Sequence, residues 1–218
     1  MKVRTLQAAA LAAGLASLLV SVAQAQTGRG AAAPPPSQAP LAEGPPIANL
    51  CVWRPQEITA ASKVGQVVLT RLKVLGSQIN AELQPERDGI NTEAKTLQTQ
   101  QASMDQATLQ ARAANLDLRK NTYVKKAQLR QQQLEATQAV QLDTIRKQMA
   151  PIVRDLYQQH HCSILFDYDS GSITQASPAM DLSREAQAAL DVKIQSLTFD
   201  LMTPEQLSAF AASQQQQR

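Results

Sequence analysis

The chain has 218 residues, of which 44% are hydrophobic, 3% aromatic and 18% charged, and its formal net charge at pH 7 is +3. Three Phe, three Tyr and one Trp are too few for an aromatic-lined sugar or single-stranded nucleic-acid site. The chain lacks the G-x-G-x-x-G and G-K-[ST] motifs, and it holds only two His and two Cys. This composition argues against nucleotide enzymes and multi-ligand metal sites, and it favours an elongated helical protein without a cofactor.

Residues 1–25 have the pattern of a secretory signal peptide. Lys2 and Arg4 precede an uncharged apolar run over residues 8–20, and Ala23-Gln24-Ala25 supplies the small-x-small cleavage site. An uncleaved anchor is the alternative, but the run is shorter than the roughly 20 residues of a membrane span. We therefore expect export to a compartment where thiols can pair. Removing Lys2 and Arg4 leaves a nearly neutral chain, so no nucleic-acid partner is predicted.

The segment after the signal is predicted to be a linker followed by a strand. Residues 26–46 are rich in Gly, Ala and Pro and bury too little apolar surface to become ordered. The apolar run over residues 47–53 fits a buried strand, which Pro55 ends. Residues 47–61 are therefore assigned to a small folded body.

From Ser62 the apolar spacing becomes helical and predicts an antiparallel hairpin over residues 62–161. Seven-residue spacing indicates a seam between two long helices. Pro85 and Gly89 interrupt the first helix, where a bend is expected, and Pro151 is expected to kink the second. The chain is expected to turn back near residues 103–107, where Ser103 or Asp105 can cap the returning helix. The predicted seam consists of Val68, Leu72, Leu75, Ile79, Leu83, Ile90, Leu97, Met104, Leu109, Leu116, Tyr123, Leu142, Ile145, Met149, Ile152 and Leu156.

The chain then returns to the body over residues 162–197. Residues 163–168 and 172–174 are predicted strands separated by a turn at Gly171, and Asp181 or Ser183 can cap a following helix. Residues 198–218 form a C-terminal extension, with a short helix starting at Thr203-Pro204-Glu205 and disorder expected from Gln214 onward. The fold class is therefore α+β, mostly α, with a small β body and a protruding helical hairpin. Short strands and a lone hairpin leave apolar surface exposed, which predicts self-association.

This order of elements resembles the OmpH/Skp family of periplasmic chaperones. The resemblance covers about residues 47–197 and rests on the strand ending near Val52, the Gln-rich hairpin, the return strand Ser163–Asp167, the Gly171-Ser172-Ile173 segment and Asp181-Leu182-Ser183. It implies a non-enzymatic periplasmic homotrimer that can associate with the outer membrane and whose helical arms enclose a cavity. Such proteins hold unfolded outer-membrane proteins without ATP. The near-neutral mature chain and the residues after Leu197 depart from that pattern.

The hairpin also carries the candidate client-binding residues. Residues 112–130 hold six basic side chains against Asp117, a local charge of +5 that could attract acidic clients or anionic lipid head groups. A solvated helix face is the alternative for the charges, and hairpin core is the alternative for the apolar residues. The competing function is a structural coiled-coil scaffold that binds one defined envelope partner. The candidate residues are Arg112, Arg119, Lys120, Lys125, Lys126, Arg130, Met104 and Leu109.

The two cysteines are the remaining chemical feature. Cys51 and Cys162 each lie in or beside a predicted strand of the body, so they either form a disulfide or remain two free thiols. A bond requires Cα atoms within about 7 Å. His160-His161-Cys162 resembles a metal motif, but adjacent His side chains point apart, so no metal site is predicted. Asp167 and Asp169 are assigned to an ordinary strand end, so no catalytic residue is predicted.

Overall fold

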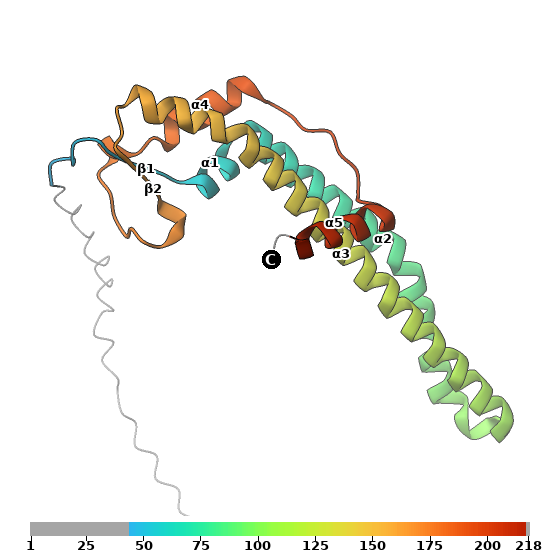
Figure 1. Cartoon of the computed structure of the whole chain (residues 1–218). Helices are drawn as coiled ribbons and strands as arrows, with labels where there is room; N and C mark the ends of the chain where they lie inside the picture. Colours follow the sequence, from blue (N-terminus) through green and yellow to red (C-terminus); the bar gives the residue numbers. More distant parts are fainter. Residues whose placement is uncertain (1–43, 217–218) are drawn as a thin grey trace, which may run out of the picture. The chain divides into compact units, whose positions relative to one another are not determined.

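The computed structural model of the chain separates into two units, residues 1–42 and 43–218, and describes residues 44–216. Figure 1 shows those residues as a small body from which a long helical hairpin projects. The predicted signal peptide and residues 26–43 of the predicted linker lie outside the described residues.

The body contains a two-stranded parallel sheet. Strand β1 (Leu50–Trp53) pairs with β2 (Ile164–Asp167), and Cys51 lies opposite Leu165 in the register. A disulfide joins Cys51 to Cys162, with the two Cα atoms 5.8 Å apart. Both cysteines are buried. The disulfide therefore fastens the two ends of the hairpin at its base, across 111 residues of sequence.

The residues after β2 differ from the prediction. Residues 172–174 do not form a strand; instead, the 3₁₀ turn η2 (Tyr168–Ser170) ends at Gly171, whose φ of 75° is in the left-handed region. The opposite edge of β1 is occupied by a different segment, because the Leu182 N–H donates to the Val52 carbonyl (2.9 Å). The turn at residues 168–171 leads the chain away from β2, so residues 172–174 pair with neither strand.

A short helix and a sharp corner lead from β1 into the hairpin. Helix α1 (Pro55–Ala61) ends at Ser62, whose hydroxyl accepts the Gly65 N–H (3.1 Å) and caps the next helix. A Cβ on Gly65 would lie 1.6 Å from the Thr59 carbonyl oxygen, so only glycine permits this close approach. The predicted start of the long helix at Ser62 is confirmed.

The hairpin consists of α2 (Lys63–Gln100), the 3₁₀ turn η1 (Gln101–Ser103) and α3 (Gln106–Gln159). Asp105 caps α3, accepting the Thr108 N–H at 2.9 Å, as predicted. Pro85 does not break the helix, because α2 continues through it. Pro85 is exposed, so the carbonyl that loses its helical partner can be solvated. Pro151 likewise lies inside α3.

The body core forms where the base of the hairpin meets the sheet and helix α4 (Ser183–Lys193). Asp181 precedes α4 and accepts the Ser183 N–H (2.9 Å) while binding the Arg54 guanidinium (3.0 Å). The fully buried apolar residues are Val52, Val64, Val68, Ile145, Ala186 and Leu190, each at 0% exposure.

The C-terminal segment crosses the hairpin. After α4, an extended stretch over residues 194–203, which we call the strap, leads to helix α5 (Pro204–Gln216). The predicted start of this helix is confirmed, with the Thr203 hydroxyl accepting the Gln206 N–H at 3.3 Å. The expected disorder from Gln214 is wrong as far as Gln216, because α5 continues to that residue. None of the helices in residues 44–216 is long and apolar enough to span a membrane.

Candidate functional site

The distal part of the hairpin, which we call the arm, is held together by a narrow apolar cluster. Ile90 and Leu97 of α2 and Leu116 of α3 are buried, and Tyr123 packs beside them. Met104 and Leu109 are half-buried against the same cluster. The structure thus places these two candidate client contacts in the packing of the arm tip.

Three of the candidate basic residues form ion pairs with acidic residues of the opposite helix. Arg112 binds Glu93 at 2.8 Å, and Arg130 binds Glu82 at 3.0 Å. Lys126 lies 3.4 Å from Glu82 and 3.6 Å from Glu86. The hydrogen bond from Arg130, together with the two nearby positive charges, lowers the pKa of Glu82.

The other three candidate basic residues have fewer acidic partners. Lys120 lies 3.8 Å from Asp117 on its own helix. Within residues 44–216, neither Arg119 nor Lys125 has an acidic oxygen within 4.0 Å. The local charge of +5 is therefore largely balanced across the hairpin. Of these two unpaired bases, Lys125 is exposed and Arg119 is half-buried.

An open stripe runs along α3 on the face turned away from α2. Leu118, Thr122, Lys125 and Leu129 follow spacings of four, three and four residues, which places them in one line. We call these four residues the arm stripe. Leu118 is 65% exposed and Leu129 is 36% exposed. Because Leu116 is buried against α2, Leu118, two residues later, faces roughly the opposite way. The arm stripe combines large apolar side chains with one unpaired positive charge.

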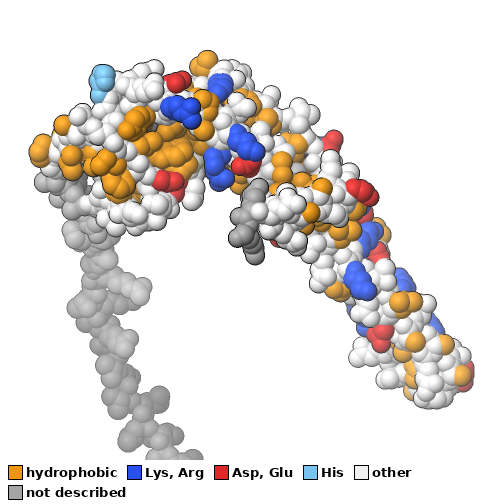
Figure 2. Space-filling view, viewed as in Figure 1, with side chains coloured by type: hydrophobic (Ala, Val, Ile, Leu, Met, Phe, Trp, Pro, Cys, Tyr) orange, Lys and Arg blue, Asp and Glu red, His pale blue; other side chains and the backbone are white. Residues whose placement is uncertain are grey.

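The body presents further apolar surface. A groove of about 550 Å³ between α1, α2 and α3 is lined by Leu69, Leu142 and Met149 together with Asp167 and Asp169. Val67 and Val74 are exposed one heptad apart on α2, and Ile164 of β2 is 51% exposed. Figure 2 shows hydrophobic side chains gathered over the body, whereas along the arm they alternate with charged and polar ones.

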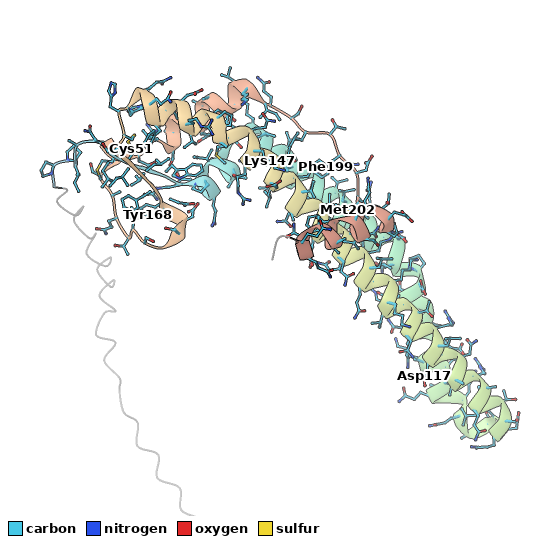
Figure 3. All side chains as sticks on the ribbon, in the orientation of Figure 1. Cys51, Asp117, Lys147, Tyr168, Phe199 and Met202 are labelled. Atoms are coloured by element: carbon cyan, nitrogen blue, oxygen red, sulfur yellow. A yellow bond between two sulfur atoms is a disulfide. The ribbon has the colours of Figure 1, made fainter. Side chains whose placement is uncertain are left out.

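Two polar residues that the sequence analysis did not single out attach the strap to the arm. The Gln133 side chain donates to the Met202 carbonyl (2.6 Å), and the Thr137 hydroxyl accepts the Met202 N–H (2.9 Å). Gln133 and Thr137 are both buried. Figure 3 labels Met202 beside the hairpin at the start of α5. The sequence contains no local signal for this contact, because Gln and Thr are ordinary residues of a solvated helix face and Met202 lies more than 60 positions away.

The residues of the metal-like motif have other partners. His160 Nε2 lies 2.8 Å from a Glu185 carboxylate oxygen, and Cys162 is consumed by the disulfide. Among residues 44–216, His, Cys, Asp and Glu side chains do not gather in threes that could hold a metal ion.

Comparison with known proteins identifies the family. The sequence profile described as "Outer membrane protein (OmpH-like)" matches residues 49–190, which is more than half of the chain. The chain belongs to the OmpH-like family. The predicted resemblance is therefore confirmed, and the family is one of chaperones, not enzymes. The match ends before the strap and α5.

A solved OmpH-like structure agrees with this assignment. A crystal structure of a candidate outer membrane chaperone (OmpH-like) from Caulobacter crescentus CB15 is similar to the chain, with 34% sequence identity and a TM-score of 0.64. The similarity covers 75% of this chain and 96% of that one. None of the curated proteins matches the chain.

Proposed function

We propose that this OmpH-like protein is an ATP-independent periplasmic holdase for unfolded outer-membrane proteins. The observation that carries the proposal is the arm stripe, where Leu118 and Leu129 are exposed beside the unpaired Lys125. Promiscuous binders use adaptable surfaces that offer several weak apolar contacts. An unfolded barrel protein presents alternating apolar segments, which such a stripe can bind without one fixed geometry.

The proposal includes a homotrimer assembled through the body. A two-stranded sheet is marginal alone, and the exposed Ile164 lies on a strand that pairs with β1 only. The apolar groove beside Leu69 and the exposed pair Val67 and Val74 add surface that a second copy could cover. Assembly through these surfaces would leave the arms free around a shared space.

The proposed location is the periplasm. The predicted cleavable signal supports export, and the disulfide between Cys51 and Cys162 suits an oxidising compartment. Anionic lipid head groups are a further candidate partner of Arg119 and Lys125, because these two bases have no acidic partner among the described residues.

Aggregation of a urea-unfolded outer-membrane barrel protein tests the proposal. Upon dilution of the barrel protein from urea, equimolar trimer is expected to suppress light scattering in the absence of ATP. Unchanged scattering with an intact trimer would refute the holdase. Tight binding of a single envelope protein without general suppression would support the coiled-coil scaffold instead.

The contribution of charge is tested by a matched pair of variants. Lys125→Gln removes the unpaired positive charge from the arm stripe, whereas Lys147→Gln removes an exposed charge that pairs with Asp143 (2.8 Å) nearer the body. We expect weaker client binding and a smaller salt dependence for Lys125→Gln only. Equal effects of the two variants would assign Lys125 to a merely solvated face.

A further inference from the structure

The line of the arm stripe continues along α3 beyond Leu129 toward the body, and the residues on that continuation are covered. The spacing of four, three and four residues repeats through Gln133, Ala136 and Val140. Gln133 is 1% exposed and Ala136 is 5% exposed, although both lie on the line that is open at Leu118 and Leu129. Because the α2-facing residue Leu134 lies on the other side of α3, packing against α2 does not explain the burial of Ala136.

The strap and α5 supply the cover. Met202 of the strap is hydrogen-bonded to Gln133 and Thr137, and α5 then packs on α3. In Figure 1 the C-terminal end of α5 lies on the concave side of the bend between body and arm. The same α3 face is thus open toward the tip and closed near the body.

Helix α5 is attached lightly, and its N-terminal cap does not depend on the arm. Its two large apolar residues, Leu207 and Phe210, are only half-buried, and α5 contains no buried residue. Its N-terminus is capped from within, since the Thr203 N–H donates to Gln206 (2.8 Å) and the Gln206 N–H donates to Thr203. Lifting α5 from Thr203 onward therefore breaks no cap and leaves the strap in place.

The outward face of α5 offers little to a client. Ser208, Ala209, Ala212 and Ser213 are exposed, and none of them is a large apolar side chain. With its two large apolar residues turned toward the arm, α5 covers this face of α3. Its own outer face presents no large apolar side chain to a client.

We propose that α5 is a displaceable cover on the α3 face that continues the line of the arm stripe through Ala136 and Val140, which an apolar segment of an unfolded outer-membrane protein replaces when it binds. This inference rests on the proposed holdase function and adds a competitor encoded in the same chain. When a cover occupies a surface for most of the time, the apparent affinity falls in proportion to the open fraction. Removing α5 therefore strengthens client binding.

Three variants of the full mature chain test the cover, with a urea-unfolded outer-membrane barrel protein as the probe. A chain ending at Thr203 lacks α5 but keeps the strap, and Leu207→Ala with Phe210→Ala loosens α5 without deleting it. Gln214→Ala with Gln215→Ala is the matched control, because both residues are exposed on α5. We expect roughly threefold to tenfold tighter binding for the truncated chain, a smaller gain for the loosened helix and no change for the control.

The outcomes separate the cover from the proposed function. If the full chain binds the probe and the truncated chain binds it equally or more weakly, the cover is refuted while the holdase stands. If neither chain binds the probe, the holdase is refuted and the cover with it. Tighter binding by both the truncated and the loosened chain, with an unchanged control, supports the cover.

Discussion

The body and the arm of this OmpH-like protein are stabilised in different ways. In the body, α1, α4, the sheet and the hairpin base enclose residues such as Ile145 and Leu190 completely, and a disulfide joins β1 to Cys162, just before β2. In the arm, two helices share one row of apolar contacts, and Ile90, Leu97 and Leu116 remain 5–8% exposed. A thin two-helix seam tolerates bending and local opening better than an enclosed core. The body is therefore expected to stay folded, whereas the arm can bend and open locally.

Breaking the disulfide has the largest expected effect. Replacing Cys51 and Cys162 with Ala releases a constraint across 111 residues of sequence. The chain-entropy model gives a loss of about 4 to 5 kcal/mol in the free energy of unfolding. Urea denaturation of the oxidised parent and the double variant measures it. A loss below about 1 kcal/mol would show that the body does not depend on this bond.

Truncating one apolar side chain in each region measures how differently the body and the arm enclose their cores. Ile145→Ala removes a fully enclosed side chain, so its expected cost is about 2 to 5 kcal/mol. Leu97→Ala in the arm removes a side chain next to solvent, where the surroundings can relax, and its expected cost is about 2 kcal/mol or less. Urea denaturation of both variants provides the comparison. Equal losses would contradict a difference in enclosure.

Much of this contrast can be predicted from the sequence, because hairpin packing follows local periodicity. The heptad positions Leu83, Ile90 and Leu97, the Asp105 cap and the start at Ser62 depend on residues close in sequence. The absence of a strand at residues 172–174 could not be predicted, because within residues 44–216 the outer edge of β2 is free and the segment that completes the sheet region is instead residues 181–182, beside β1. The same holds for the strap, because contacts of Gln133 and Thr137 with Met202 join residues more than 60 positions apart.

The net charge of residues 112–130 cannot be judged from their own helix alone. Glu82 and Glu93 lie in a separate segment of sequence, and only the antiparallel register brings them beside Arg130 and Arg112. Aligning the two predicted heptad seams around the turn at residues 103–107 would have revealed this pairing before the structure was known.

A cross-hairpin ion pair is expected to contribute little to stability. Glu93→Gln removes the charge that binds Arg112 at 2.8 Å, and partly exposed pairs of this kind contribute about 0.2 to 1 kcal/mol. Thermal unfolding at low and high salt measures the loss, with Asp117→Asn as the control within one helix. If Glu93→Gln cost as much as Ile145→Ala, the arm would be held by charge and not by its apolar seam.

The smallest expected effect is a local pH response at the arm tip. Hydrogen bonds from the Thr108 hydroxyl and backbone amide lower the pKa of Asp105 from its ordinary 3.8. Because the native pKa is depressed, the cap is fully present above the ordinary pKa and is lost as pH falls through the lowered value. The Thr108 amide resonance is expected to titrate below pH 3.8 in the parent and to stay constant in Asp105→Asn. A parent midpoint at or above 3.8 would contradict the cap.

Hydrogen exchange with and without a bound unfolded barrel protein tests the division of roles most directly. The account predicts that client binding changes amide exchange along α3 over residues 111–140 and in α5, while β1, β2 and α4 exchange as before. Client-induced changes confined to the sheet and α4, with the arm unaffected, would contradict it.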